Sequence, residues 1–140
     1  MSRVILLAAD RPLPLLEPAF RRVRCTGRFT VETDGFSVRP HEYYRGAVDE
    51  LGLELKPFQY KLDLEATQED VNALRAYLAG HCRPGEQVEL WNLWVGVDRE
   101  DQVPRFQGEL ADLALDTLEQ LCFPPVERDC PGQCRLTVTI

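Results

Sequence analysis

The first apolar segment of the chain, Val4 to Ala8, is apolar at every position. A strand of this kind is covered on both faces, so the segment predicts a central strand of a sheet. Prolines at positions 12, 14 and 18 then predict an extended connector, because proline fits neither a helix interior nor a sheet ladder. Residues 58–64 alternate strictly, with apolar side chains at the even positions, and predict a half-buried strand.

Residues 29–38 also alternate, and the pair Asp34-Gly35 stands in their middle. Asp-Gly between two alternating runs is typical of a two-residue hairpin turn, in which both central residues adopt positive φ. In that register Val31 opposes Val38. The side chains that share one face, and that we expect to be buried, are Phe29, Val31, Thr33, Phe36 and Val38.

Helical spacing occurs in two places in the first part of the chain. Tyr44, Val48 and Leu51 predict a short helix over about 41–51, ended by Gly52. A second helix is predicted to open at Thr67 with acidic residues in its first turn. Its apolar stripe consists of Val71, Leu74, Tyr77 and Leu78.

The last third predicts a strand over 88–97, a polar loop over 98–101 and a second strand over 103–110. A capping box, Asp116 to Glu119, then predicts a short helix that ends near Cys122, and residues 136–140 predict a closing strand. One helix over 109–121 also fits the periodicity, but it would align four acidic side chains. We favour a strand followed by a helix over 103–122.

These elements predict one α+β domain over residues 1–140, with a mixed sheet and two to three helices. Residues 58–140 follow the β-α-β-β-α-β order of a ferredoxin-like unit, preceded by an N-terminal strand, a hairpin and a short helix. This order alone says nothing about function, because many functions share that fold.

The net charge of the 140 residues is −7, and its distribution is uneven. Residues 1–45 carry +3, whereas residues 46–140 carry −10. An acidic surface repels nucleic acid and anionic membranes, so we expect neither as a partner. The longest early apolar run is far shorter than the ~20 residues of a membrane helix, and five cysteines without a secretion signal indicate a reducing, cytoplasmic location.

The basic residues of the first third include a cluster of arginines that could bind an anion, because a guanidinium donates two parallel hydrogen bonds to phosphate or carboxylate. The anion-binding candidates are Arg21, Arg22, Arg24 and Arg28. Strand geometry would split the cluster between two faces, so charged edge residues are the alternative interpretation.

Other candidate groups are fewer. Cys130 and Cys134 flank a turn and are weak thiol candidates for a metal, since a tetrahedral site needs two further ligands. We therefore expect no metal, no cofactor and no disulfide. His81 is expected to cap a helix end. Trp91 and Trp94 have opposite strand parity; both are expected in the core, and otherwise they are partner-contact candidates.

No catalytic motif is present, and the sequence names no catalytic residue. We favour a non-enzymatic interaction or regulatory module whose acidic face binds a protein partner with a basic surface. The alternative is a small anionic-ligand-binding domain, or an enzyme, that uses the Arg21–Arg28 cluster. The sequence does not predict the oligomeric state.

Overall fold

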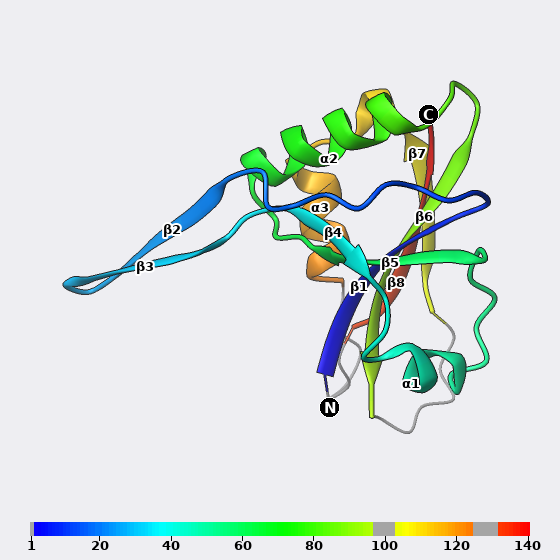
Figure 1. Cartoon of the computed structure of the whole chain (residues 1–140), viewed down its shortest axis with the longest axis horizontal. Helices are drawn as coiled ribbons and strands as arrows, with labels where there is room; N and C mark the ends of the chain where they lie inside the picture. Colours follow the sequence, from blue (N-terminus) through cyan, green and yellow to red (C-terminus); the bar gives the residue numbers. More distant parts are fainter. Residues whose placement is uncertain (1, 97–102, 125–131) are drawn as a thin grey trace.

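The computed structural model describes residues 2–96, 103–124 and 132–140. Within these residues the chain is an α+β protein with a six-stranded mixed sheet, a two-stranded hairpin sheet and three helices (Figure 1). The strands are β1 (Ser2–Ala9), β2 (Arg21–Thr26), β3 (Phe29–Asp34), β4 (Ser37–Pro40), β5 (Phe58–Asp63), β6 (Gln87–Val95), β7 (Arg105–Glu109) and β8 (Cys134–Thr139). The helices are α1 (Arg45–Asp49), α2 (Gln68–His81) and α3 (Leu115–Cys122).

The six-stranded sheet has the order β4-β5-β1-β6-β8-β7. All neighbours are antiparallel except β7 and β8, which are parallel. The prediction of a central N-terminal strand is confirmed, because β1 lies between β5 and β6. Successive side chains of β1 enter two different hydrophobic clusters, so both of its faces are buried.

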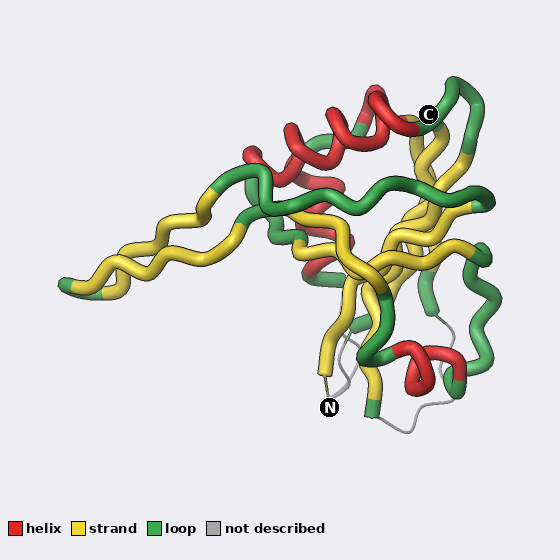
Figure 2. Tube along the Cα trace, viewed as in Figure 1, coloured by secondary structure: helices red, strands yellow, loops and turns green. Residues whose placement is uncertain are grey.

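One face of the sheet is covered by α2 and α3, and the other by α1 with the loop that follows it (Figure 2). The predicted stripe of α2 is confirmed, since all four of its residues are buried in the larger cluster. Thr67 caps this helix as expected by accepting a hydrogen bond from the backbone N–H of Asp70. The sequence therefore fixes α2 through both its stripe and its cap.

The elements after residue 58 follow the predicted β-α-β-β-α-β order along the chain. In space, however, β1 lies between β5 and β6, and β7 pairs with β8 at the edge of the sheet. A ferredoxin-like arrangement is therefore not clearly shown. The predicted strand followed by a helix over 103–122 is confirmed, with a 3₁₀ turn (Leu110–Asp112) between β7 and α3. The loop predicted over 98–101 lies outside the described residues.

Two helix predictions need correction. The first helix is shorter than the predicted 41–51, because α1 begins only at Arg45 and already ends at Asp49; Gly52, with a φ of 67°, lies three residues beyond its end. The predicted capping box at Asp116 is wrong, since α3 already begins at Leu115. Instead, the Thr117 hydroxyl accepts a hydrogen bond from the backbone N–H of Ala114, 3.1 Å away.

The predicted hairpin over 29–38 is wrong. β3 pairs with β2, and the two-residue turn between them is Gly27-Arg28 rather than Asp34-Gly35. Phe36 and Val38 are buried as expected, but Phe29, Val31 and Thr33 are exposed. The chain at Gly35 does not turn back; it leaves the hairpin and enters the main sheet as β4.

Candidate functional site

The hairpin of β2 and β3, residues 21–34, projects away from the rest of the molecule, and we call it the arm (Figure 2). Arg22 is the one buried residue among positions 21–33. No residue of the arm belongs to either hydrophobic cluster. The arm nevertheless carries apolar side chains: Phe29 is 78% exposed, and Val23 and Val31 are also exposed. This apolar surface adds nothing to the core of the fold.

The tip of the arm is built by glycine. Gly27 has a φ of 62°, a conformation that L side chains adopt rarely. It stands at the first position of the two-residue loop, where the turns favoured in hairpins need a positive φ. The turn brings Phe29 opposite Thr26 and leaves Arg28 exposed at the end of the arm. The tip thus carries an exposed guanidinium group and an exposed aromatic ring on two consecutive residues.

The arm continues a longer ribbon that begins at the edge of the main sheet. Leu16 pairs with Val38, and the backbone N–H of Ala19 donates to the carbonyl of Phe36 at 3.1 Å. At Gly35 the ribbon is so narrow that a Cβ would lie 2.4 Å from the carbonyl oxygen of Phe20. Gly35 is therefore required for close approach, and not for a turn. The arm leaves the body as an extension of an ordered ladder.

A buried arginine fixes the base of the arm to α2. Arg22 is 5% exposed, and its guanidinium donates to both carboxylate oxygens of Asp70, at 2.5 and 3.3 Å. It also donates to the Asp63 carboxylate at 3.0 Å and to the carbonyl oxygen of Asp34 at 2.6 Å. Burial disfavours the charge, but the hydrogen bonds to Asp70 and Asp63 outweigh it and raise the pKa of Arg22.

Asp70 is the buried partner in this network and has no exposed surface. Its carboxylate also accepts a hydrogen bond from the Thr67 hydroxyl at 2.5 Å. The carboxylate thus joins the first turn of α2 to the arm. Ion pairs of this kind add little net stability, because desolvation of both groups offsets their attraction, but they define geometry. We conclude that the network sets the direction of the arm.

The other three arginines of the predicted anion-binding cluster do not converge with Arg22 on a common site. Arg21 pairs with Asp34 at 3.3 Å, and Arg24 pairs with Glu65. Arg28 stands at the tip and forms no ion pair with a described residue. Three of the four guanidinium groups are therefore neutralised by carboxylates of the same chain, and the structure does not gather the four around an anion.

A groove lies at the opposite end of the molecule, between β7 and the start of α3. Its volume is about 280 Å³, and its floor is apolar. The floor consists of Phe106, Leu113, Leu136 and Val138. Gly108 lines the groove from the edge strand, and a Cβ placed there would meet no atom within 4 Å. Glycine within a strand often marks a place where another chain or ligand comes close. We call this hollow the α3 groove.

The rim of the α3 groove is acidic. Glu109, Asp112 and Asp116 line it, and all three are exposed. No ion pair joins them to a basic side chain of the described residues. Arg75 lies nearby, where it donates to the carbonyl oxygen of Leu113 at 3.0 Å. The predicted acidic surface therefore includes an apolar hollow with a negative rim.

The tryptophans have different environments. Trp91 is 2% exposed and belongs to the smaller hydrophobic cluster, so it does not form an exposed partner contact. Its indole N–H donates to Glu89, 3.3 Å away. Trp94 is half-buried, and its indole N–H donates to the carbonyl oxygen of Gly132 at 3.1 Å. Trp91 is thus part of the packing, as the favoured interpretation predicted.

The thiols are free where they are described. Cysteine is commonly a buried residue, and Cys82, Cys122 and Cys134 are buried, but Cys25 is exposed on the arm. Burial raises the pKa of Cys122 to about 11 and that of Cys134 to about 12. Cys130 lies outside the described residues. Within residues 2–96, 103–124 and 132–140, no group of three or more potential ligands is placed to hold a metal.

The two histidines are also placed differently. His81 is exposed in the last turn of α2, as predicted. His41 is buried, and its Nε2 has no hydrogen-bond partner among the described residues. Burial and the positive charge of Arg45 lower the pKa of His41. His41 is therefore a neutral packing residue at neutral pH.

Sequence reasoning missed both surfaces. Gly27 was a usable signal for the arm, because Gly-X between two β-rich runs is a hairpin motif. Gly108 was the available signal for the groove, as an isolated glycine in a predicted strand. Nothing in the sequence showed that Phe29 would be exposed, since its alternation with Val31 is equally typical of a buried face.

Comparison of the chain with family models, with curated proteins and with solved structures found no match in any of the three. No helix within the described part of the chain is long and apolar enough to cross a membrane.

Proposed function

We propose that this chain is a non-enzymatic interaction module that binds another polypeptide through its arm. The observation that carries the proposal is an arm exposed on both faces, with Phe29 78% exposed at its tip, yet fixed at its base by the buried Arg22–Asp70 pair. The acidic α3 groove is the second contact surface, suited to a basic segment of a partner. The acidic groove thus agrees with the protein partner of basic surface that the charge pattern predicts.

The exposed apolar residues of the arm support binding rather than folding. A two-stranded hairpin is at best marginally stable alone, and it usually gains stability by packing one face on a core. Neither face of this arm does so. Val23 and Cys25 lie on one face, while Phe29 and Val31 lie on the other. Burial of such side chains becomes favourable only when a partner covers them.

The anchored base of the arm supports the same function. An element that is already held in its bound direction loses less conformational entropy when it binds. The ladder from Leu16 to Val38 and the Arg22 network both limit how the arm can move. The small-anion alternative has less support, because Arg21, Arg22 and Arg24 already pair with carboxylates of the chain.

A site-specific cross-linker tests the proposal. A photoreactive phenylalanine analogue is placed at Phe29 in one variant and at Tyr43 in a control. Tyr43 is 89% exposed but lies outside the arm and the α3 groove. After irradiation of cells that produce each variant, we expect a protein adduct from position 29 whose yield falls when Val31→Asp is added. Equal yields from the two positions would contradict the proposal.

A shortened arm provides the matched folding control. In this variant Asn-Gly replaces residues 23–32, so that a two-residue turn joins Arg22 to Thr33, which already face each other. The core and the Arg22 network stay intact. We expect the free energy of unfolding to change by less than about 1 kcal/mol, since the removed residues are exposed. Loss of binding with retained stability would place the function in the arm.

A further inference from the structure

The tip of the arm and the α3 groove have complementary chemistry within one chain. The tip offers a guanidinium group, Arg28, next to an exposed phenyl ring, Phe29. The groove offers an apolar floor inside a rim of carboxylates. We infer that the occupant of the groove is the arm of a second copy of this chain. This inference rests on the proposed function, because it names the partner that the arm binds.

The groove fits one large apolar side chain. Its volume of about 280 Å³ lies just below the range of about 300–1,000 Å³ that is common for small-molecule sites. Such a hollow suits a side chain that enters from a partner. Gly108 is one of the residues that line this space, and a Cβ placed there would meet no other atom within 4 Å. The phenyl ring of Phe29, at the tip of the arm, is the apolar group that would fill the α3 groove.

The charges agree with the same pairing. Glu109, Asp112 and Asp116 line the groove and form no ion pair with described basic residues. Arg28 forms no ion pair with a described residue either. If Phe29 enters the groove, its chain neighbour Arg28 lies at the acidic rim. The arm has four arginines and two acids, which leaves +2 on residues 21–34 and −9 on the rest of a chain of net charge −7.

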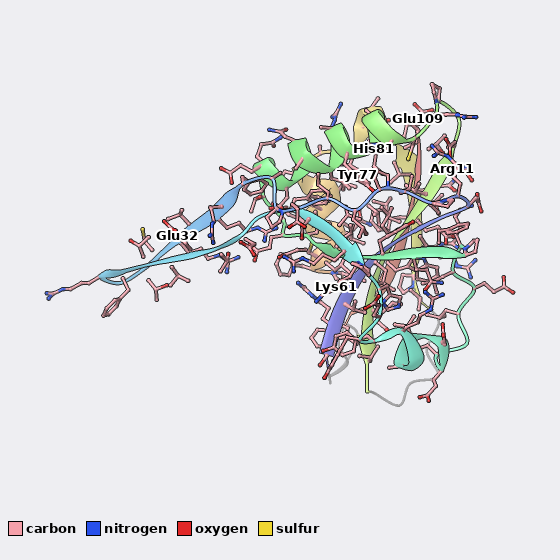
Figure 3. All side chains as sticks on the ribbon, viewed as in Figure 1. Arg11, Glu32, Lys61, Tyr77, His81 and Glu109 are labelled. Atoms are coloured by element: carbon pink, nitrogen blue, oxygen red, sulfur yellow. The ribbon has the colours of Figure 1, made fainter. Side chains whose placement is uncertain are left out.

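The arm does not reach the groove of its own chain. Glu32 on the arm and Glu109 at the groove lie at opposite ends of the molecule (Figure 3). The contact is therefore between molecules, and it joins two different surfaces. Such a heterologous contact leaves a free arm at one end and a free groove at the other, so that it builds a closed ring or an open filament. The exposed edge of β7, which is the last strand of the sheet, lies beside the groove and offers backbone groups for further contact.

Nucleic acid is the other class of partner for a basic hairpin, and the charges favour a second copy over it. Nucleic-acid binding depends mainly on neutralising phosphates with lysine and arginine. On this arm Arg21 and Arg24 are engaged by Asp34 and Glu65, and the body around the arm is acidic. One unpaired guanidinium group at the tip is a weak phosphate contact. The same single guanidinium group is sufficient to pair with a carboxylate on the acidic rim while the neighbouring phenyl ring enters the apolar groove.

Sedimentation velocity of the full chain over a wide concentration range tests the inference with two complementary variants. Phe29→Ser removes the arm contact and leaves the groove. Gly108→Val fills the groove and leaves the arm, and it suits a strand because valine is favoured there. We expect the mass of the unchanged chain to grow with concentration. Each variant alone should associate about tenfold more weakly or worse, as expected for a central apolar contact.

The mixture of the two variants provides the decisive result. A Gly108→Val chain keeps a working arm, and a Phe29→Ser chain keeps a working groove, so that the equimolar mixture should form a one-to-one dimer that does not grow further. Tyr43→Ser, which removes an aromatic residue outside both surfaces, should assemble like the unchanged chain. Circular dichroism of each variant checks that the fold is retained.

Several outcomes would overturn the inference. One is a chain that stays monomeric at the highest concentration; another is a mixture that associates no better than its components. A third is arm-dependent binding of labelled duplex DNA that Arg28→Glu abolishes. If the chain stays monomeric but the cross-linker at position 29 captures a different protein, the proposed function stands and this inference fails. If the cross-linker also captures nothing, both fail.

Discussion

The buried pair of Arg22 and Asp70 allows a quantitative prediction about what holds the arm. We consider Arg22→Met, Asp70→Asn and the double variant. The residues are 48 positions apart in the chain and connect β2 to the first turn of α2. Arg22 is 5% exposed and Asp70 is fully buried, so solvent cannot replace the lost partner.

The two single changes should differ in cost. Arg22→Met leaves the Asp70 carboxylate buried with the Thr67 hydroxyl as its remaining side-chain partner, and removal of one member of a buried pair costs about 3–5 kcal/mol. Asp70→Asn should cost less, about 1–3 kcal/mol, because Arg22 keeps the Asp63 carboxylate. The double variant removes both buried charges, so the two effects should overlap by at least about 1 kcal/mol.

Urea unfolding at neutral pH measures all three variants, and unchanged slopes would show that the comparison is valid. Arg24→Met is the matched control. Arg24 pairs with Glu65 in an exposed position, and such pairs contribute about 0–1 kcal/mol. If Arg22→Met does not fold, Asp70→Asn and the control still test the difference between buried and exposed pairs. A cost below about 1 kcal/mol for Arg22→Met, or strictly additive effects, would refute the role given to this network.

Three further predictions follow from single residues. The folded chain binds a proton at His41 less readily than the unfolded chain, because the pKa of His41 is lowered in the fold. The free energy of unfolding should therefore fall as the pH drops below about 6.5. Urea titrations at several pH values should show that His41→Gln loses this dependence. Gly35→Ala should destabilise by about 2 kcal/mol or more because of the contact with the Phe20 carbonyl, whereas Gly80→Ala, in open space on α2, should be neutral or stabilising by up to about 1 kcal/mol in thermal unfolding. A thiol reagent should label Cys25 in the native chain at once and Cys122 only after unfolding, and rapid labelling of Cys122 would contradict its burial.

Sequence patterns predicted those helices and strands correctly whose burial pattern is the same along the whole element. The β1 segment is apolar throughout because both of its faces are covered, and the stripe of α2 faces one cluster from Val71 to Leu78. Periodicity reports such an environment directly. The strand and helix after residue 103 were separated correctly by the cost of aligning four acidic side chains.

The hairpin prediction failed because its environment changes along the ribbon. Phe36 and Val38 lie in the core, while Phe29 and Val31 share the alternation but stand in solvent. The alternation correctly indicated extended strands, but it did not show which of these side chains are buried. Two turn signals competed, Gly27-Arg28 and Asp34-Gly35, and local propensity favours the second. The contact of Gly35 with Phe20, which decides between them, depends on the position of the preceding connector.

The sequence indicated which kinds of residue form the site, but not which residues pair with one another. The arginines were found, but the acids that pair with Arg22 and Arg24 follow about 40 to 50 residues later in the chain, and a local sequence pattern gives no information on such distant pairing. The separation of charge was more informative. It indicated an acidic face and a basic N-terminal third, and the structure puts acids on the rim of the α3 groove and arginines on the arm.

Because the arm contributes nothing to the hydrophobic core, we expect the stability of the fold and the proposed binding to respond to different substitutions. The two hydrophobic clusters include no residue of the arm, so changes at its tip leave the core packing as it is. The Arg22–Asp70 pair is a buried link between the two parts, because one member belongs to β2 and the other to α2. A loosened pair would keep the chemistry of Phe29 and Arg28 but lose their fixed direction. We expect the proposed binding to weaken as a result, because a free arm would lose more conformational entropy when it is ordered against a partner.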